Sequence, residues 1–140
     1  MIDWAAERCD QLVVFVNSSE VRDTAPGHLR AGWIADLHPH VHVREVRHRL
    51  GTDFADQVLW ARWMELFRSE WPHETGPHTV FSSDDYVNEL ALRFGADSVV
   101  VDADRSTVPI TATQVRESPG EHLHRLAPPV RVWVEANWLS

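Results

Sequence analysis

The feature that most constrains this chain is the alternation of short β-type apolar runs with longer amphipathic segments. Such alternation is typical of strand–helix–strand crossovers, in which helices cover a parallel sheet. Runs rich in β-branched and aromatic residues predict four buried strands, over residues 12–16, 41–46, 78–81 and 98–101. We therefore expect an α/β fold with an open parallel sheet and flanking helices.

The intervals between these strands carry the apolar periodicity of amphipathic helices, which we expect over about 24–37, 54–69 and 84–94. Thr24 and Ser83 are candidate N-caps, because a hydroxyl can accept a hydrogen bond from a backbone N–H group. Gly95 is placed to end the third helix. The last third of the chain predicts short helices, the final one starting at Pro128. With no repeat and no linker, residues 1–140 are expected to form one domain.

The charge balance limits the class of partner. The 140 residues carry 21 acidic side chains against 13 basic ones, all of them Arg, for a formal charge of −8. We therefore do not expect the protein to bind a nucleic acid along its phosphate backbone, and any anionic ligand must be bound by a small local group of residues. The lone Cys9 excludes an intramolecular disulfide, and no apolar run has the length of a membrane span. We expect a cytoplasmic protein with no membrane partner. The sequence leaves open whether the chain forms a homo-oligomer.

Polar residues gather after the predicted strands, where ligands bind in open parallel sheets. They are Asn17 after the first strand; Ser82, Ser83 and Tyr86 after the third; and Asp102, Arg105, Thr111, Thr113 and Arg116 after the fourth. Hydroxyl groups at a helix N-terminus, with an Arg one turn later, can form a cradle for an anion. Thr111, Thr113 and Arg116 fit that description, and they fit equally well a capped helix with a solvated Arg.

Residues 110–116, Ile-Thr-Ala-Thr-Gln-Val-Arg, resemble the Ile-Ser-x-Thr-x-x-Arg signature of the nucleotidyltransferase superfamily that carries a His-x-Gly-His motif. More narrowly, the chain resembles the nicotinamide mononucleotide adenylyltransferases of the NAD-salvage regulator type. The other segments that carry this resemblance are 8–14, 30–34, 80–86 and 101–105, with a continuation at 128–131.

The resemblance implies a Rossmann-like fold and adenylyl transfer from ATP to a nicotinamide mononucleotide, which yields NAD and pyrophosphate. Arg116 would be the catalytic residue and would bind the ATP phosphates together with Thr111, Thr113, Asp102 and Arg105. The implied mononucleotide site comprises Asn17, Ser82, Ser83, Tyr86, Trp60 and Trp63. Mg²⁺ would accompany ATP.

The family begins with a strand and the His-x-Gly-His motif, whereas this sequence starts near the end of the family's first helix. We therefore expect an N-terminally truncated nucleotidyltransferase-like domain whose first, central strand is missing. Strands 12–16 and 78–81 would then lack their shared neighbour. Enzymatic activity stays open, because a catalytically inactive nucleotide-binding domain is the alternative.

Two further features have competing interpretations. Trp60 and Trp63 lie three positions apart on one predicted helix, so they share a face that either stacks on a base or packs in the core. His38, His40 and His42 alternate as they would on one strand face, with His48 nearby. Because Pro39 interrupts this run and no acid completes it, no metal ligand is predicted. A His-rich metal-binding protein stays a lesser alternative.

Overall fold

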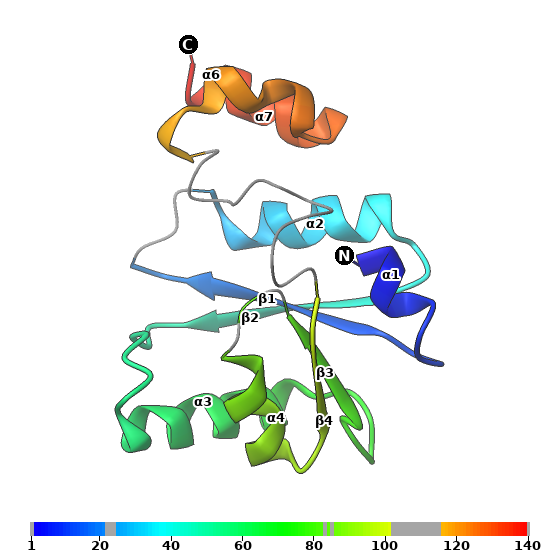
Figure 1. Ribbon diagram of the computed structural model, residues 1–140. Coiled ribbons are helices and arrows are strands. Elements are labelled where there is room, and N and C mark those ends of the chain that lie inside the picture. The colour runs from blue at the N-terminus through cyan, green and yellow to red at the C-terminus, as the bar shows by residue number, and fades with distance from the viewer. Residues whose placement is uncertain (1, 22–24, 83, 85, 102–115, 140) are drawn as a thin grey trace. The chain divides into compact units, whose positions relative to one another are not determined.

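The computed structural model describes residues 2–21, 25–82, 84, 86–101 and 116–139. The chain divides into two compact units, Met1–Ala103 and Asp104–Ser140. In the first unit, strands and helices alternate along the chain (Figure 1), in the order α1 Ile2–Ala6, β1 Val13–Ser19, α2 Gly27–Leu37, β2 His42–His48, α3 Gln57–Glu70, β3 Thr79–Ser82, α4 Val87–Phe94 and β4 Asp97–Val100.

The strands form two parallel pairs. β1 pairs with β2 in a register that runs from Val13 opposite His42 to Ser19 opposite His48. β3 pairs with β4 from Thr79 opposite Asp97 onward. The prediction of a mixed α/β fold with four short parallel strands is therefore confirmed, in the form of two small sheets. Two boundaries that bear on the site differ from the predicted ones: β1 continues to Ser19 and β3 to Ser82, so Asn17 and Ser82 lie within strands and not after them.

β1 and β3 each have one strand partner among the described residues. The N–H of His42 donates to the carbonyl of Leu12 at 2.9 Å, and the N–H of Val101 donates to the carbonyl of Ser82 at 2.7 Å. Peptide groups alternate in direction along a strand. The backbone N–H and C=O groups of Phe15 therefore point away from β2, and those of Phe81 point away from β4. Each pair therefore keeps an edge with no third strand in the described part of the chain.

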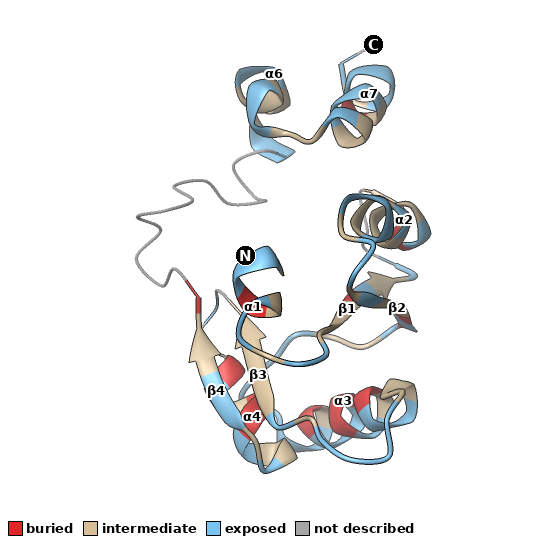
Figure 2. Ribbon diagram, turned by 90° about the vertical axis from the view of Figure 1, so that its right-hand side faces the viewer, coloured by how far each residue is buried: buried red, intermediate tan, exposed pale blue. Residues whose placement is uncertain are grey.

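The core of the first unit lies where α3 meets β2 and α4. Figure 2 shows buried residues along α3 and α4. The cluster contains Val46, Trp60, Trp63, Met64, Phe67 and Leu90. Apolar residues on one face of α3 produce this packing, because they recur every three to four positions. Burying them is the main favourable contribution to the stability of the unit.

The helix limits differ from the predicted ones at their N-terminal ends. α3 begins after Asp56, whose carboxylate accepts hydrogen bonds from the N–H groups of Val58 and Leu59 at 2.9 and 3.2 Å. α4 begins at Val87, which is fully buried. Gly95 ends α4 with φ +70°, as predicted. The predicted caps Thr24 and Ser83 lie outside the described residues.

The second unit contains α6 Pro119–His122, a 3₁₀ helix at Leu123–Arg125 and α7 Pro128–Asn137. The expected short helices, the last one starting at Pro128, are therefore confirmed. Trp133 and Trp138 pack edge to face, with their ring centroids 5.5 Å apart. Among the helices that the structure describes, none combines the length and apolar content needed to cross a membrane.

Candidate functional site

A cavity of about 830 Å³ lies between β1 and β3. The two strands contribute residues along most of their lengths, from Leu12 to Asn17 and from His78 to Ser82. The other walls come from α1 and the segment after it, from the end of α3 and from α4; their lining residues include Ile2, Ala5, Arg8, Cys9, Phe67, Trp71, Leu90 and Phe94. This volume falls in the range of roughly 300–1,000 Å³ typical of small-molecule sites.

Three residues of the predicted mononucleotide site line this one cavity. Asn17 belongs to β1, Ser82 ends β3, and Tyr86 precedes α4. Asn17 is exposed, whereas Ser82 and Tyr86 are partly buried. The structure therefore brings together polar groups from segments that are far apart in the sequence.

Ser82 and Tyr86 each make a local contact that helps to position them. The Ser82 hydroxyl oxygen accepts a hydrogen bond from the N–H of Asp84 at 3.2 Å, and a hydroxyl in that state still has its own hydrogen to donate. The Tyr86 ring stacks on Phe54, with centroids 5.5 Å apart and planes at 6°. Ser82 can therefore offer a donor to a ligand, and the position of Tyr86 is set by the segment that leads into α3.

Charged groups reach the cavity from the segment after α1. The Arg8 guanidinium lies 3.6 Å from the centroid of the Trp4 ring and donates to the Trp4 carbonyl at 2.8 Å. Asp10 is the only carboxylate residue among the described lining residues. A single carboxylate does not make a Mg²⁺ site by itself.

Cys9 also lines the cavity. Burial raises the pKa of its thiol above the ordinary value, and the negative charge of Asp10 raises that pKa further. The thiol is therefore protonated at neutral pH and is a poor nucleophile.

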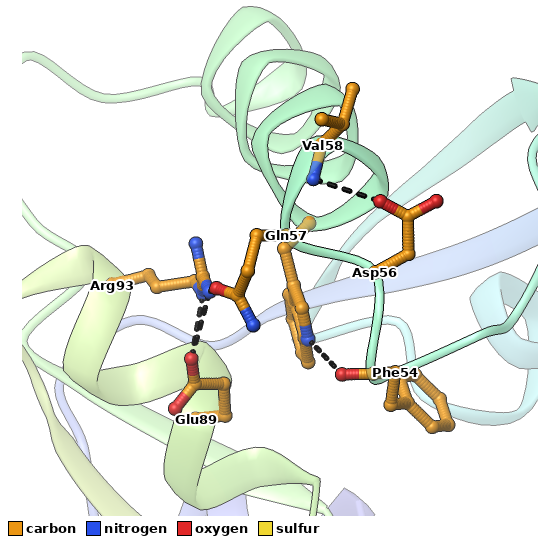
Figure 3. Close-up of polar contacts among 7 residues, drawn as sticks. Phe54, Asp56, Gln57, Val58, Glu89 and Arg93 are labelled. Atoms are coloured by element: carbon orange, nitrogen blue, oxygen red, sulfur yellow. Dashed lines mark hydrogen bonds and ion pairs between the residues drawn. The ribbon is translucent and has the colours of Figure 1, made fainter.

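Trp60 and Trp63 are core residues in the structure. They are only 5% and 9% exposed, and each indole N–H donates to a backbone carbonyl, of Phe54 at 2.9 Å and of Gly51 at 3.0 Å. Around them, the Asp56 carboxylate points at the N–H of Val58, and Arg93 points at Glu89 (Figure 3). Of the two interpretations of this tryptophan pair, the geometry favours core packing, and neither ring lines the cavity.

The predicted ATP-binding residues are distributed differently. Asp102, Arg105, Thr111 and Thr113 lie outside the described residues, as does Ser83 of the mononucleotide set. Arg116 belongs to the second compact unit, where it is exposed and helical.

Sequence reasoning missed two arginines. Arg30 of α2 donates from Nη2 to the Asn17 carbonyl at 3.0 Å, and Arg8 lines the cavity. Both lie in segments that carry the family resemblance, so their position there was the available signal. Periodicity could not assign them, because an Arg on an amphipathic helix is usually solvated.

Comparison with known proteins adds no family: no protein-family model matches the chain, and the search of curated proteins gives no match.

Proposed function

We propose that the cavity between β1 and β3 binds a nucleotide, and that the protein transfers the adenylyl group of ATP to a nicotinamide mononucleotide. The observation that carries this proposal is the convergence of Asn17, Ser82 and Tyr86 on one cavity of about 830 Å³. The sequence predicts all three residues just after strand ends, whereas Asn17 and Ser82 lie toward the carboxyl ends of β1 and β3. Their shared lining of one cavity supports a common ligand.

The architecture gives secondary support. A Rossmann-like sheet without its central strand would consist of two parallel pairs, and the described strands form β1–β2 and β3–β4 pairs. The cavity lies between the inner strands of those pairs. We therefore assign the unit to the Rossmann-like class as part of the same proposal.

In the proposed reaction, an oxygen of the mononucleotide 5′-phosphate attacks the α-phosphorus of ATP. A new phosphorus–oxygen bond forms, the bond from the α-phosphorus to the bridging oxygen breaks, and pyrophosphate leaves. Mg²⁺, carried by ATP, offsets charge on the phosphates. Within the first unit, Asn17 and Ser82 would offer hydrogen bonds to the mononucleotide. The family resemblance assigns binding of the β- and γ-phosphates to Arg116.

The test combines turnover with binding. The protein is incubated with ATP, Mg²⁺ and nicotinamide mononucleotide, and NAD and pyrophosphate are measured; the proposal expects equal amounts of the two products. Binding of both substrates without product would instead identify a catalytically inactive nucleotide-binding domain. Absence of both binding and product would refute the proposal.

The role of Arg116 has a separate test. Charge-assisted hydrogen bonds contribute about 1.5–3 kcal/mol, so Arg116→Ala is expected to weaken ATP binding roughly 10- to 150-fold. AMP, which lacks the distal phosphates, should bind both proteins alike. Arg116→Lys should recover part of the loss, because a point charge cannot reproduce the planar guanidinium. Equal loss of ATP and AMP affinity would remove Arg116 from the phosphate site.

A further inference from the structure

Asp3, His38 and His40 form a cluster of metal-ligating side chains outside the cavity. His38 Nδ1 lies 2.9 Å from Asp3 Oδ1, and His40 Nε2 lies 3.7 Å from the same oxygen. One ligand atom from each residue lies within 4.8 Å of the other two. We propose that this cluster binds a divalent transition-metal ion such as Zn²⁺, at a place separate from the proposed nucleotide site.

The spacing of the three ligand atoms suits one ion. Ligands that surround zinc tetrahedrally at about 2.0–2.1 Å are about 3.3 Å from one another. The two distances measured from Asp3 Oδ1, 2.9 and 3.7 Å, lie on either side of that value. Asp3 and His40 are exposed and His38 is partly buried, so small rotations of the two exposed side chains would complete the geometry, with water as the fourth ligand.

The donor set selects the class of metal. Two imidazoles and one carboxylate suit zinc and its neighbours, whereas magnesium and calcium prefer an all-oxygen shell. The ion that this cluster would bind therefore belongs to a different class from the Mg²⁺ that ATP would carry.

The backbone holds the two histidines in place. His38 is the C-cap of α2, where its N–H donates to the Ile34 carbonyl at 2.8 Å. The carbonyl of His38 accepts from the N–H of Val41 at 3.1 Å, which closes the turn that contains His40. Because these hydrogen bonds already order the backbone around the two histidines, bringing their side chains together around an ion costs less conformational entropy.

The cluster differs from the histidine set considered in the sequence. His42 starts β2, and its ring packs edge to face with His73, with ring centroids 6.3 Å apart. His48 is buried, and its Nδ1 accepts a hydrogen bond from the N–H of Leu50. Neither belongs to the cluster, and the missing acid comes from Asp3, 35 positions before His38.

An ion at this site would cross-link α1 to the turn after α2. Ile2 and Ala5 of α1 line the cavity, so metal binding would also hold one wall of that cavity in place. The proposal predicts that Zn²⁺ raises the melting temperature, because an ion that binds only the folded state stabilises it.

The test is titration of the metal-free protein with Zn²⁺ by calorimetry, and with Co²⁺ by visible absorption. We expect one ion per chain, and at least tenfold weaker binding in each of the variants Asp3→Asn, His38→Gln and His40→Gln. His42→Gln is the matched control and should bind as the wild type does. A tenfold excess of Mg²⁺ should not compete.

Several results would overturn the proposal. One is the absence of stoichiometric Zn²⁺ binding by a folded wild-type protein, which would leave the cluster as an ordinary ion pair. Another is a loss in His42→Gln as large as that in His40→Gln, which would place the ion on the strand face. Unchanged affinity in Asp3→Asn would also overturn it. His40 has a side chain 55% exposed, so its replacement tests binding with little effect on folding.

Discussion

Arg30 joins the carboxyl end of β1 to the start of α2. Its Nη2 donates to the carbonyl of Asn17 at 3.0 Å, and its Nε donates to the carbonyl of Ala25 at 3.1 Å. The bond to Ala25 is partly buried, whereas the bond to Asn17 is exposed to solvent. One guanidinium therefore positions the strand residue that we assign to the nucleotide site.

Replacing Arg30 with Ala should lower both stability and nucleotide affinity. Loss of the bond to Asn17 is expected to cost about 1 kcal/mol of unfolding free energy and to weaken mononucleotide binding several-fold. Denaturant unfolding and calorimetry measure the two effects. Arg62→Ala, at an exposed position of α3, is the control for loss of a positive charge. Equal effects of the two substitutions would show that charge, and not the position of Asn17, matters.

Gly27 should not accept a larger side chain. A Cβ built there would lie 1.8 Å from Ser18 Oγ and 2.4 Å from Ser18 Cβ. Gly27→Ala is therefore expected to destabilise the protein by about 1–3 kcal/mol in denaturant unfolding. Adding Ser18→Gly should restore part of that loss, since it removes both contacting atoms.

Gly32 provides the contrast within the same helix. No heavy atom lies within 4 Å of a Cβ built there, so Gly32→Ala should stabilise the protein by about 0.5–1 kcal/mol. If Gly27→Ala were as stable as Gly32→Ala, the close approach of α2 to β1 would be refuted.

Replacing Trp63 distinguishes a role in core packing from a role in binding a ligand. Trp63→Phe keeps most of the apolar contact and leaves the Gly51 carbonyl without the indole donor. We expect a loss of about 1–3 kcal/mol in unfolding free energy, with nucleotide affinity unchanged. Weaker mononucleotide binding at unchanged stability would instead restore the base-stacking interpretation.

The sequence predicted the elements of the fold better than the composition of the site. Strand identity and parallel pairing followed from continuous apolar runs such as 98–101, since a strand covered on both faces needs apolar residues throughout. The start of α3 was predicted too early, because Phe54 extends the apolar periodicity of the helix. In the structure it precedes the Asp56 cap and packs on Tyr86.

The site was only partly accessible to sequence reasoning. The strand-end rule points to Asn17 and Ser82, and both line the cavity. The cluster at Asp3 depends on a contact between α1 and the turn after α2, and nothing in local periodicity encodes a contact across 35 positions. Trp60 and Trp63 share a helix face in either interpretation, so only their burial separates the core from a ligand site.

Cys9 should label slowly at neutral pH. Because burial and the Asp10 charge raise the pKa of the thiol, the reactive thiolate is scarce at pH 7 and forms at a higher pH than in an ordinary cysteine. The rate of alkylation, followed by mass spectrometry from pH 7 to 10, should rise later than that of a free cysteine peptide. Asp10→Asn should shift the profile slightly to lower pH. A profile that coincides with the peptide's would contradict the burial of this thiol.

The most direct test of the nucleotide site is calorimetric titration of nicotinamide mononucleotide against the wild type, Ser82→Ala and Ser98→Ala. Ser82 lines the cavity, whereas Ser98 lies on β4 outside the lining and donates to Asn88 Oδ1 at 2.8 Å. Loss of one hydrogen bond to a ligand corresponds to roughly a 5- to 10-fold change in affinity. The proposed site predicts that loss in Ser82→Ala and wild-type affinity in Ser98→Ala. Failure of the wild type to bind the mononucleotide, or equal affinity in all three proteins, would contradict it.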